Sequence, residues 1–470
     1  MSMYGLQVRS ACLALSALSL SGCLVGDQRN TYGRLRGDVL SEPGFDLGPA
    51  PDRASGWTQE DEAALAAGPL SLERVLTLAR ERNAELRAAL HSWKRTVEQI
   101  PQEATWPDPQ LRYTYMAAPL HTRAGPQRQN LSFNQRIPFP GKLSAATDAA
   151  VSAAEAEAAS YLARVLVLEE RVAQAWAEIF RQERMLEVVT AQLRIVKQVD
   201  GSVNDAFGAG QAGVTGAHTA RARLRRTLLG AQEVQHQRGL AIARATLNEL
   251  IGRPPTASLP ATPAHLTLAP LPEGTLADLV QEGLARRPEL REALHRAERG
   301  RALTRRAWYE YFPDFTAGVQ WFDIGGSSVT YRNAGDDAFG VTFGIDLPIF
   351  VEGRSARVRQ GEAETREAEA TVKAIRDRIG REVSVALSRA RAADDSLTIF
   401  TSALSQATTA LRSAQDAFAA TNGDFTTVLE AERDLEETRH GIHMSQAEGV
   451  AARAALWRAL GRPQTPARQR

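Results

Sequence analysis

The chain has 470 residues, and its 56 basic and 55 acidic side chains give a formal net charge of +1. This balance gives no electrostatic reason to expect nucleic acid as a partner. Aromatic residues make up only 6% of an alanine-rich chain, which suits long, closely packed helices better than one thick globular core.

The N-terminus carries the two cysteines, Cys12 and Cys23, so a disulfide framework and a cysteine metal site are excluded. The apolar run from Ala11 to Leu20 is too short to span a bilayer, and Leu20-Ser21-Gly22-Cys23 follows it directly. This motif resembles a bacterial lipobox, which implies that residues 1–22 are a lipoprotein signal peptide and that Cys23 is acylated. Because Leu24 and not aspartate follows, the resemblance implies release to the outer membrane. The alternative is an ordinary secretory signal with a chance cysteine.

Residues 23–69 are rich in Gly, Pro and Asp and lack sustained periodicity, so we expect an extended N-terminal arm. From residue 70 the chain repeats itself, which predicts a first repeat at 70–255, a linker at 256–274, a second repeat at 275–463 and a tail at 464–470. The landmarks that recur in the same order are Leu72–Val75 and Leu276–Leu279, Glu85–Leu90 and Glu289–Leu294, Trp106–Asp108 and Phe312–Asp314, Ile137–Lys142 and Leu347–Arg354, Phe207–Leu224 and Phe418–Leu435, and Leu250–Pro254 and Leu460–Pro463.

Each repeat contains a pair of segments in which apolar and polar residues alternate, as in half-buried strands. We expect strands at about 109–117 and 129–137 in the first repeat, and at about 314–322 and 338–347 in the second. The segments that separate them, Ala117–Gln127 and Asp323–Asp337, are expected to be loops. In the last strand Phe339, Val341, Phe343, Ile345 and Leu347 alternate with Gly340, Thr342, Gly344 and Asp346.

Two environments produce such alternation, because a soluble sheet packs its apolar face on a core and a transmembrane sheet turns it to lipid. Periodicity alone favours the soluble sheet. The context favours the membrane, since the strands nearly match the ~9–11 residues that cross a bilayer and no other segment supplies a globular core. Four strands cannot close a barrel, so the membrane interpretation requires several chains, and three chains would supply twelve strands.

Residues 141–253 and 349–462 contain no proline, and each range has room for two long antiparallel helices. In the first range apolar residues follow coiled-coil spacing, with Gln182 as one polar core position. A helix from about Leu143 to Phe207 would reach roughly 90–100 Å at a rise of 1.5 Å per residue. Such a length exceeds what a globular core needs and suits a protein that spans a compartment.

Over essentially its whole mature length the chain resembles the TolC-type outer membrane efflux proteins. The resemblance rests on the duplicated unit, the lipobox, the stretch Gln135–Leu143 and the paired ends at Leu250–Pro254 and Leu460–Pro463. It implies a mainly α fold with a transmembrane β-hairpin pair, in which a duplicated helix–β-hairpin–long-helix unit forms a homotrimer with a 12-stranded β-barrel and a periplasmic α-helical barrel. It also implies docking to a periplasmic adaptor protein and an inner-membrane pump of the RND or ABC type. The sequence at 138–142 is closer to the heavy-metal cation subgroup than to the drug subgroup.

The sequence contains no phosphate loop, no nucleophile elbow and no His-Glu-x-x-His motif, so we expect neither an enzyme nor a cofactor. His440 and His443 lie one helical turn apart and are a weak candidate for a metal site. The alternative is a solvated helix face, which is the more common origin of such a pair.

Asp205 and Asp416 each stand two residues before a phenylalanine at the end of a long helix. In a trimer each would form a ring of three carboxylates at a periplasmic aperture, which would favour cations and resist closure when ionised. The alternative is an ordinary surface aspartate near a helix turn. The turns that follow are our candidates for adaptor-docking tips, with Gly210 and Gly213 in the first repeat and Thr421 and Gly423 in the second.

These observations favour a passive exit channel in the outer membrane, driven by partners. The main alternative is a lipidated periplasmic coiled-coil adaptor (membrane fusion) protein, which would show one helical hairpin between small β-rich domains. A structural lipoprotein without a pore is a third interpretation, but it leaves four amphipathic strands unexplained.

Overall fold

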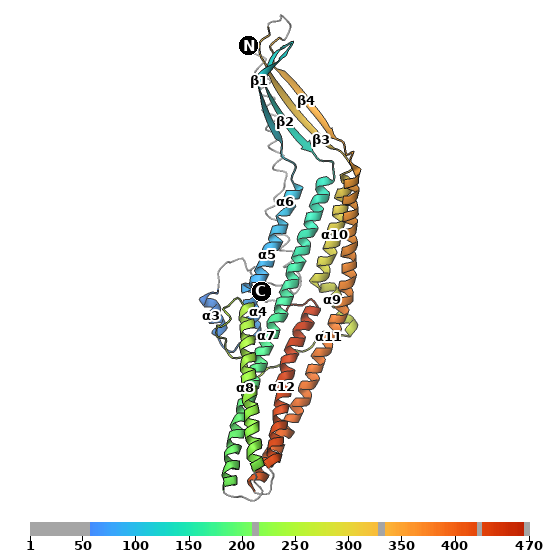
Figure 1. The fold of residues 1–470 in the computed structure, drawn as a ribbon. Helices are drawn as coiled ribbons and strands as arrows, with labels where there is room; N and C mark the ends of the chain where they lie inside the picture. Colours follow the sequence, from blue (N-terminus) through green and yellow to red (C-terminus); the bar gives the residue numbers. More distant parts are fainter. Residues whose placement is uncertain (1–56, 209–215, 328–333, 421–424, 465–470) are drawn as a thin grey trace. The chain divides into compact units, whose positions relative to one another are not determined.

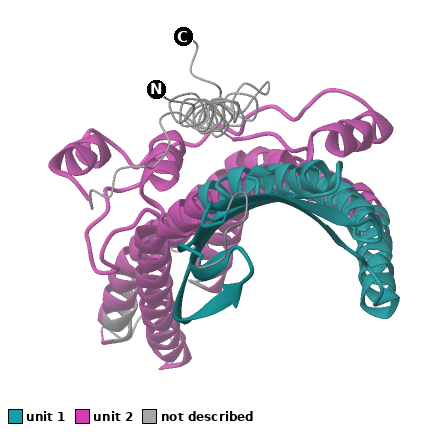
Figure 2. Cartoon of the chain, turned by 90° about the horizontal axis from the view of Figure 1, so that it is seen from above, with its two compact units in different colours: residues 1–39, 92–159, 291–373 teal, residues 40–91, 160–290, 374–470 magenta. Residues whose placement is uncertain are grey.

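The computed structural model describes residues 57–208, 216–327, 334–420 and 425–464. The chain divides into two compact units, coloured separately in Figure 2: unit 1 comprises residues 1–39, 92–159 and 291–373, and unit 2 comprises residues 40–91, 160–290 and 374–470. Each unit therefore combines segments from both halves of the duplicated sequence, so the two repeats do not form separate domains.

A four-stranded antiparallel sheet lies in unit 1, and its order is the order of the chain, β1-β2-β3-β4 (Figure 1). The strands are β1 (Gln110–Thr122), β2 (Gly125–Ile137), β3 (Asp314–Ile324) and β4 (Ala338–Asp346). The two repeats meet where β2 pairs with β3, with Phe133 opposite Val319. Since β1 and β4 each pair on one side only, the sheet has two free edges among the described residues.

The first hairpin is longer than the sequence pattern predicts. Most of the segment Ala117–Gln127, expected as a loop, belongs to β1 and β2, and a turn at residues 123–124 joins the strands. The register shifts between Tyr115 and Leu120, which interrupts the strict alternation on which the prediction rested. Gly125 permits the turn because its φ of 141° is one that residues with a side chain rarely adopt.

Unit 2 is helical. It contains α3 (Gln59–Ala66), α4 (Leu72–Arg82), α8 (Gly216–Leu250), α9 (Leu276–Arg286) and α12 (Phe425–Ala459). The unit boundaries fall inside the other main helices, α5 (Ala84–Val97), α7 (Lys142–Gly208), α10 (Pro288–Tyr309) and α11 (Val351–Ala419). The short helix α6 (Gln99–Ala104) lies in unit 1.

The expectation of an extended arm from residue 23 to 69 is wrong at its C-terminal end, where α3 forms; residues 23–56 lie outside the described residues. Thr58 caps this helix, since its side chain accepts a hydrogen bond from the Asp61 amide and the Asp61 carboxylate accepts one from the Thr58 amide. This Thr-x-x-Asp box is a helix start signal that the composition of the arm obscures.

The long proline-free ranges form the long helices that the sequence predicts. α7 has 67 residues and α11 has 69, which at 1.5 Å per residue corresponds to about 100 Å each. In unit 2 the C-terminal part of α7 packs against α8, where Val189 and Val196 contact Leu229. The corresponding parts of α11 and α12 pack in the same way, through Leu411 and Leu435 among others.

The buried cores of these two helix pairs consist of alanine, valine and leucine, whose small and medium-sized side chains allow the helices to pack closely. The polar core position, Gln182, is buried on α7 and lies 2.8 Å from Nδ1 of His236 on α8. A buried amide needs a hydrogen-bond partner, and this contact supplies one. Among the described residues, no helix is both long and apolar enough to cross a bilayer.

Candidate functional site

The outer strands of the sheet expose large apolar side chains along one row each. On β4 Phe339, Val341 and Phe343 are 79%, 68% and 82% exposed, and on β1 Leu111 and Tyr115 are 70% and 66% exposed. A sheet that packs on a soluble core would bury such a row, and an apolar patch of this kind marks a surface that meets lipid or protein. The exposed apolar row and the free backbone edge therefore occur on the same strands.

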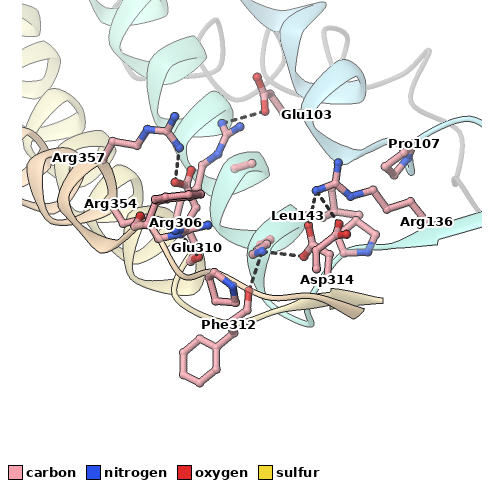
Figure 3. Close-up of a pocket in the computed structure, with 17 residues that line it drawn as sticks. Glu103, Pro107, Arg136, Leu143, Arg306, Glu310, Phe312, Asp314, Arg354 and Arg357 are labelled. Atoms are coloured by element: carbon pink, nitrogen blue, oxygen red, sulfur yellow. Dashed lines mark hydrogen bonds and ion pairs between the residues drawn. The ribbon is translucent and has the colours of Figure 1, made fainter. Parts of the chain in front are cut away.

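At the end of the sheet where the strands meet the helices, unit 1 contains a pocket of about 550 Å3 lined by charged residues (Figure 3). Asp314, at the start of β3, is its central carboxylate and is buried. Its oxygens lie 2.9 Å from Nη2 of Arg136 and 2.6 Å from Nζ of Lys142, and one of them accepts a hydrogen bond from the Phe139 amide. Asp314 thus joins the start of the second hairpin to the end of the first.

Further ion pairs surround this carboxylate. Arg306 of α10 lies 3.1 Å from Glu103, and Arg357 of α11 pairs with Glu310. Arg354 donates from Nε to the Glu310 carbonyl oxygen at 2.7 Å. The charges in the pocket are therefore paired with one another, which indicates a structural joint between the sheet and the helices.

The segment that follows β2 requires a glycine at residue 141. Its φ is 99°, and a Cβ at this position would lie 2.7 Å from the ring of Tyr309. The ring of Phe139, two residues earlier, stacks on Phe312 with centroids 4.5 Å apart. A side chain at residue 141 would therefore be strained and would also push the Tyr309 ring away.

Sequence reasoning missed Asp314 as a site residue, although it noticed the landmark Phe312–Asp314. Its counterpart in the first repeat, Asp108, is exposed and has none of these partners in the described part of the chain. The difference arises because Asp314 meets residues of the other repeat, which no local pattern reveals.

The candidate aperture residues lie near the C-terminal ends of the two longest helices. Asp205 on α7 and Asp416 on α11 are both exposed, and no hydrogen bond or ion pair links their side chains to other described residues. Both carboxylates are therefore free of partners among the described residues of one chain. The tip residues Gly210, Gly213, Thr421 and Gly423, as well as Cys23, lie outside the described residues.

A buried acid near the same helix ends escaped the sequence analysis. Glu432 on α12 is only 3% exposed, and its Oε1 atom has no hydrogen-bond partner among the described residues. Burial raises the pKa of Glu432 to about 7; nearby Arg225 opposes this shift and Glu436 reinforces it. Arg225 of α8 forms an ion pair with Glu436.

The histidine pair does not gain support as a metal site. His440 is exposed, whereas His443 is half-buried, with Nδ1 3.2 Å from Oε1 of Gln446 and its ring edge against Phe180. Burial and the nearby Arg184, Arg439 and His440 lower the pKa of His443. Within the described ranges no third ligand completes the pair.

The sequence matches the outer membrane efflux protein family over residues 75–253 and 279–462. It is 24% identical over 401 residues to the cobalt-zinc-cadmium resistance protein CzcC of Cupriavidus metallidurans, covering 84% of this chain and 91% of that protein.

Solved channel structures share the fold. A crystal structure of CusC superposes with a TM-score of 0.70 at 20% identity, over 88% of this chain and 97% of that one. The CmeC outer membrane channel of Campylobacter jejuni gives a TM-score of 0.71 at 14% identity, over 90% and 93% of the two chains. These likenesses confirm the expected TolC-like fold class.

Proposed function

Because this chain belongs to the outer membrane efflux protein family, we propose that three copies of it form a passive exit duct of a tripartite efflux system. The family consists of channels, and the chain is accordingly not an enzyme. The observation that best supports a trimer is the sheet, because it combines two free edges with exposed rows of apolar side chains. Four strands are too few to close a barrel, so β4 of one copy must pair with β1 of the next.

The internal repeat predicts the register of that pairing. Within one chain β2 pairs with β3 so that Phe133 lies opposite Val319. The landmarks of the duplication align Phe133 with Phe343 and Val319 with Tyr113. If the contact between copies repeats the contact between repeats, Phe343 of one copy lies opposite Tyr113 of the next. Both side chains belong to the exposed apolar rows.

Disulfide cross-linking tests this arrangement. Phe343→Cys combined with Tyr113→Cys should give covalent dimers and trimers on non-reducing gels of outer-membrane fractions. The matched control, Phe339→Cys with Tyr113→Cys, separates the thiols by four residues, or about 14 Å along the strand, and should not cross-link. A heat-modifiable trimer that cross-links only in the control pair would show that the register is wrong. A protein that migrates as a monomer would contradict the duct itself.

The partners follow from the same proposal, because the sequence contains no phosphate loop that would bind a nucleotide and supply transport energy. A periplasmic adaptor would dock at the tips that contain Gly210, Gly213, Thr421 and Gly423, and an inner-membrane RND-type or ABC-type pump would deliver the substrate. Site-directed photocross-linking from the tips tests this. Cross-links to an adaptor support the docking site, and cross-links only to other copies of the chain contradict it.

The substrate class that we propose is heavy-metal cations. It is supported by the match to a cobalt-zinc-cadmium resistance protein and by the sequence at 138–142. Deletion of the gene should lower tolerance to Zn2+, Co2+ or Cd2+, and the intact gene should restore it. Unchanged metal tolerance together with increased drug sensitivity would assign the duct to drugs instead.

We further propose that Asp205 and Asp416 form carboxylate rings at the periplasmic aperture. Both side chains are exposed near helix ends, which leaves them available to meet their copies in a trimer. Replacing both by Ala should alter single-channel conductance or cation preference in planar bilayers, because the rings would concentrate cations. Unchanged conductance and selectivity would exclude this role.

Anchoring through Cys23 is a separate proposal that rests on the lipobox. Mass spectrometry of the mature N-terminus should show an acylated Cys23, and Cys23→Ser should abolish the modification. An unmodified N-terminus would identify an ordinary signal peptide and would leave the duct proposal intact.

A further inference from the structure

Three side chains of types that can bind a metal ion gather in unit 1, outside the pocket around Asp314. Glu155 comes from α7, and His295 and Glu298 stand one turn apart on α10. The Nδ1 atom of His295 lies 3.1 Å from Oε2 of Glu155 and 3.2 Å from Oε2 of Glu298. One ligand atom from each of the three residues lies within 4.8 Å of the other two.

The charges of these three side chains do not balance among themselves. An imidazole nitrogen carries at most one proton, yet two carboxylate oxygens lie within hydrogen-bond distance of Nδ1. A protonated His295 would still leave the three side chains with a net charge of −1. A neutral His295 would leave two negative charges, and a divalent ion at this position would neutralise both.

The geometry suits a small divalent ion. Zn2+ binds histidine nitrogen and carboxylate oxygen at about 2.0–2.2 Å, which places the ligand atoms of a tetrahedral site roughly 3.4 Å apart. The distances from Nδ1 are within a few tenths of an ångström of that spacing. The side chains of His295 and Glu155 are 29% and 34% exposed, and that of Glu298 is 55% exposed, so water has access as a fourth ligand.

We propose that Glu155, His295 and Glu298 bind one divalent transition-metal ion of the Zn2+ and Co2+ class. Imidazole and carboxylate ligands favour these ions, and the lack of a thiolate or thioether among the three disfavours Cu+. Arg291 and Arg299 lie one turn to either side of His295 on α10 and reduce the affinity for cations. The third neighbouring arginine, Arg296, lies 2.5 Å from Glu292.

The bound ion would join two helices that come from different repeats, because α7 belongs to the first and α10 to the second. Glu155 and His295 are distant in sequence, so an ion between them fixes one helix against the other and stabilises unit 1. Metal binding should therefore raise the thermal stability of the folded protein by mass action. This inference does not depend on the duct, since it concerns binding by the purified chain.

The test is titration of the purified full chain, free of a histidine tag and treated with EDTA, by isothermal calorimetry with ZnCl2. We expect one Zn2+ per chain, binding at least tenfold weaker in His295→Ala and in Glu155→Gln, and unchanged binding in the control His440→Ala. With Co2+ in place of Zn2+, the wild-type chain should give a visible absorption band that His295→Ala loses.

Both variants must first show the oligomeric state and far-UV circular dichroism of the wild-type chain without metal. The Glu155→Gln variant keeps the side-chain volume, so it remains informative if His295→Ala folds poorly. No stoichiometric Zn2+ binding by the wild-type chain would overturn the proposal, and so would binding that both variants retain. The titration does not measure channel activity. A failure of the metal-site proposal can therefore be distinguished from a failure of the duct proposal.

Discussion

The carboxylate of Asp314 lies 2.6 Å from the ammonium nitrogen of Lys142, and through this contact the first residue of β3 is tied to the first residue of α7. The same carboxylate pairs with Arg136, so one buried acid is shared by two basic side chains. The pair belongs to two different repeats and closes the junction between the hairpins.

Replacing Asp314 by Ala should destabilise the protein, because it leaves Lys142 without its carboxylate in a mostly buried position. We expect a loss on the order of 2–3 kcal/mol, below the cost of breaking a fully buried pair because Arg136 is 55% exposed. Urea unfolding measures the change. The control is Asp148→Asn, which breaks an exposed pair with Arg305 and should cost less than about 1 kcal/mol. Equal losses in both variants would contradict the central role of Asp314.

Gly141 gives a second prediction, from backbone conformation. Gly141→Ala should cost about 1–3 kcal/mol, since alanine disfavours a φ of 99° and its Cβ would meet the Tyr309 ring. The matched control is Gly353→Ala at the equivalent landmark, which lies inside α11 with open space around it. That change should be neutral or stabilise by up to about 1 kcal/mol. The melting temperature of Gly141→Ala should therefore fall below that of the wild type, whereas that of Gly353→Ala should stay the same or rise. Equal melting temperatures in the two variants would contradict the prediction.

A third prediction concerns pH. The folded-state pKa of Glu432 is about 7, above its ordinary value of 4.5. The protonated form is therefore the one that the fold favours. Its contribution to stability is complete below about pH 4.5 and is lost as the pH rises through 7.

Between pH 5 and pH 8, Glu432 should reduce the stability of the wild-type chain by on the order of 1–3 kcal/mol. In Glu432→Gln this contribution to the pH dependence should disappear, and the variant should be the more stable protein at pH 8. Thermal melts at both pH values measure the effect. Glu430→Gln changes an exposed acid on the same helix and should melt like the wild type. A Glu432→Gln variant with the wild-type pH profile would contradict the prediction.

The fourth prediction concerns a buried ion pair in unit 2. Glu169 is 1% exposed, pairs with Arg80, and accepts a hydrogen bond of 2.7 Å from the Gln464 amide. Burial raises the pKa of Glu169, and Arg80 counteracts this shift. Arg80→Ala should therefore cost on the order of 3 kcal/mol, because it leaves a buried carboxylate without its cation.

A double-mutant cycle separates this charge effect from lost packing. Arg80→Ala combined with Glu169→Gln removes the unpaired charge and should recover a substantial part of the loss. Additive costs in the urea unfolding of the double variant would show that the two side chains do not interact.

The sequence predicts the long helices and the strands well, because the patterns that identify them are local in the sequence. The absence of proline over residues 141–253 identifies α7 and α8, and alternation identifies both hairpins. The polar core position Gln182 is also visible in the heptad pattern, although its partner His236 is not. Helix α3 was missed because a single capping box marks a helix of only eight residues.

The site residues were harder to predict, since their environment depends on distant segments. Asp314 acquires its role from Lys142 and Arg136, which lie 172 and 178 residues away along the chain. Glu432 looks like any acid on a charged helix until helix packing removes it from water. The cluster of Glu155 and His295 likewise requires α7 and α10 to meet.

The free edges of β1 and β4 have a consequence for the biosynthesis of the protein. A newly exported copy with a formed sheet presents unpaired backbone groups beside exposed aromatic side chains, the combination that promotes aggregation. In the proposed trimer a neighbouring copy covers these edges, so the duration of the hazard depends on how long a chain stays unassembled. Cells that overproduce the protein should accumulate misfolded material in proportion to the concentration of unassembled chains unless a chaperone shields the strands.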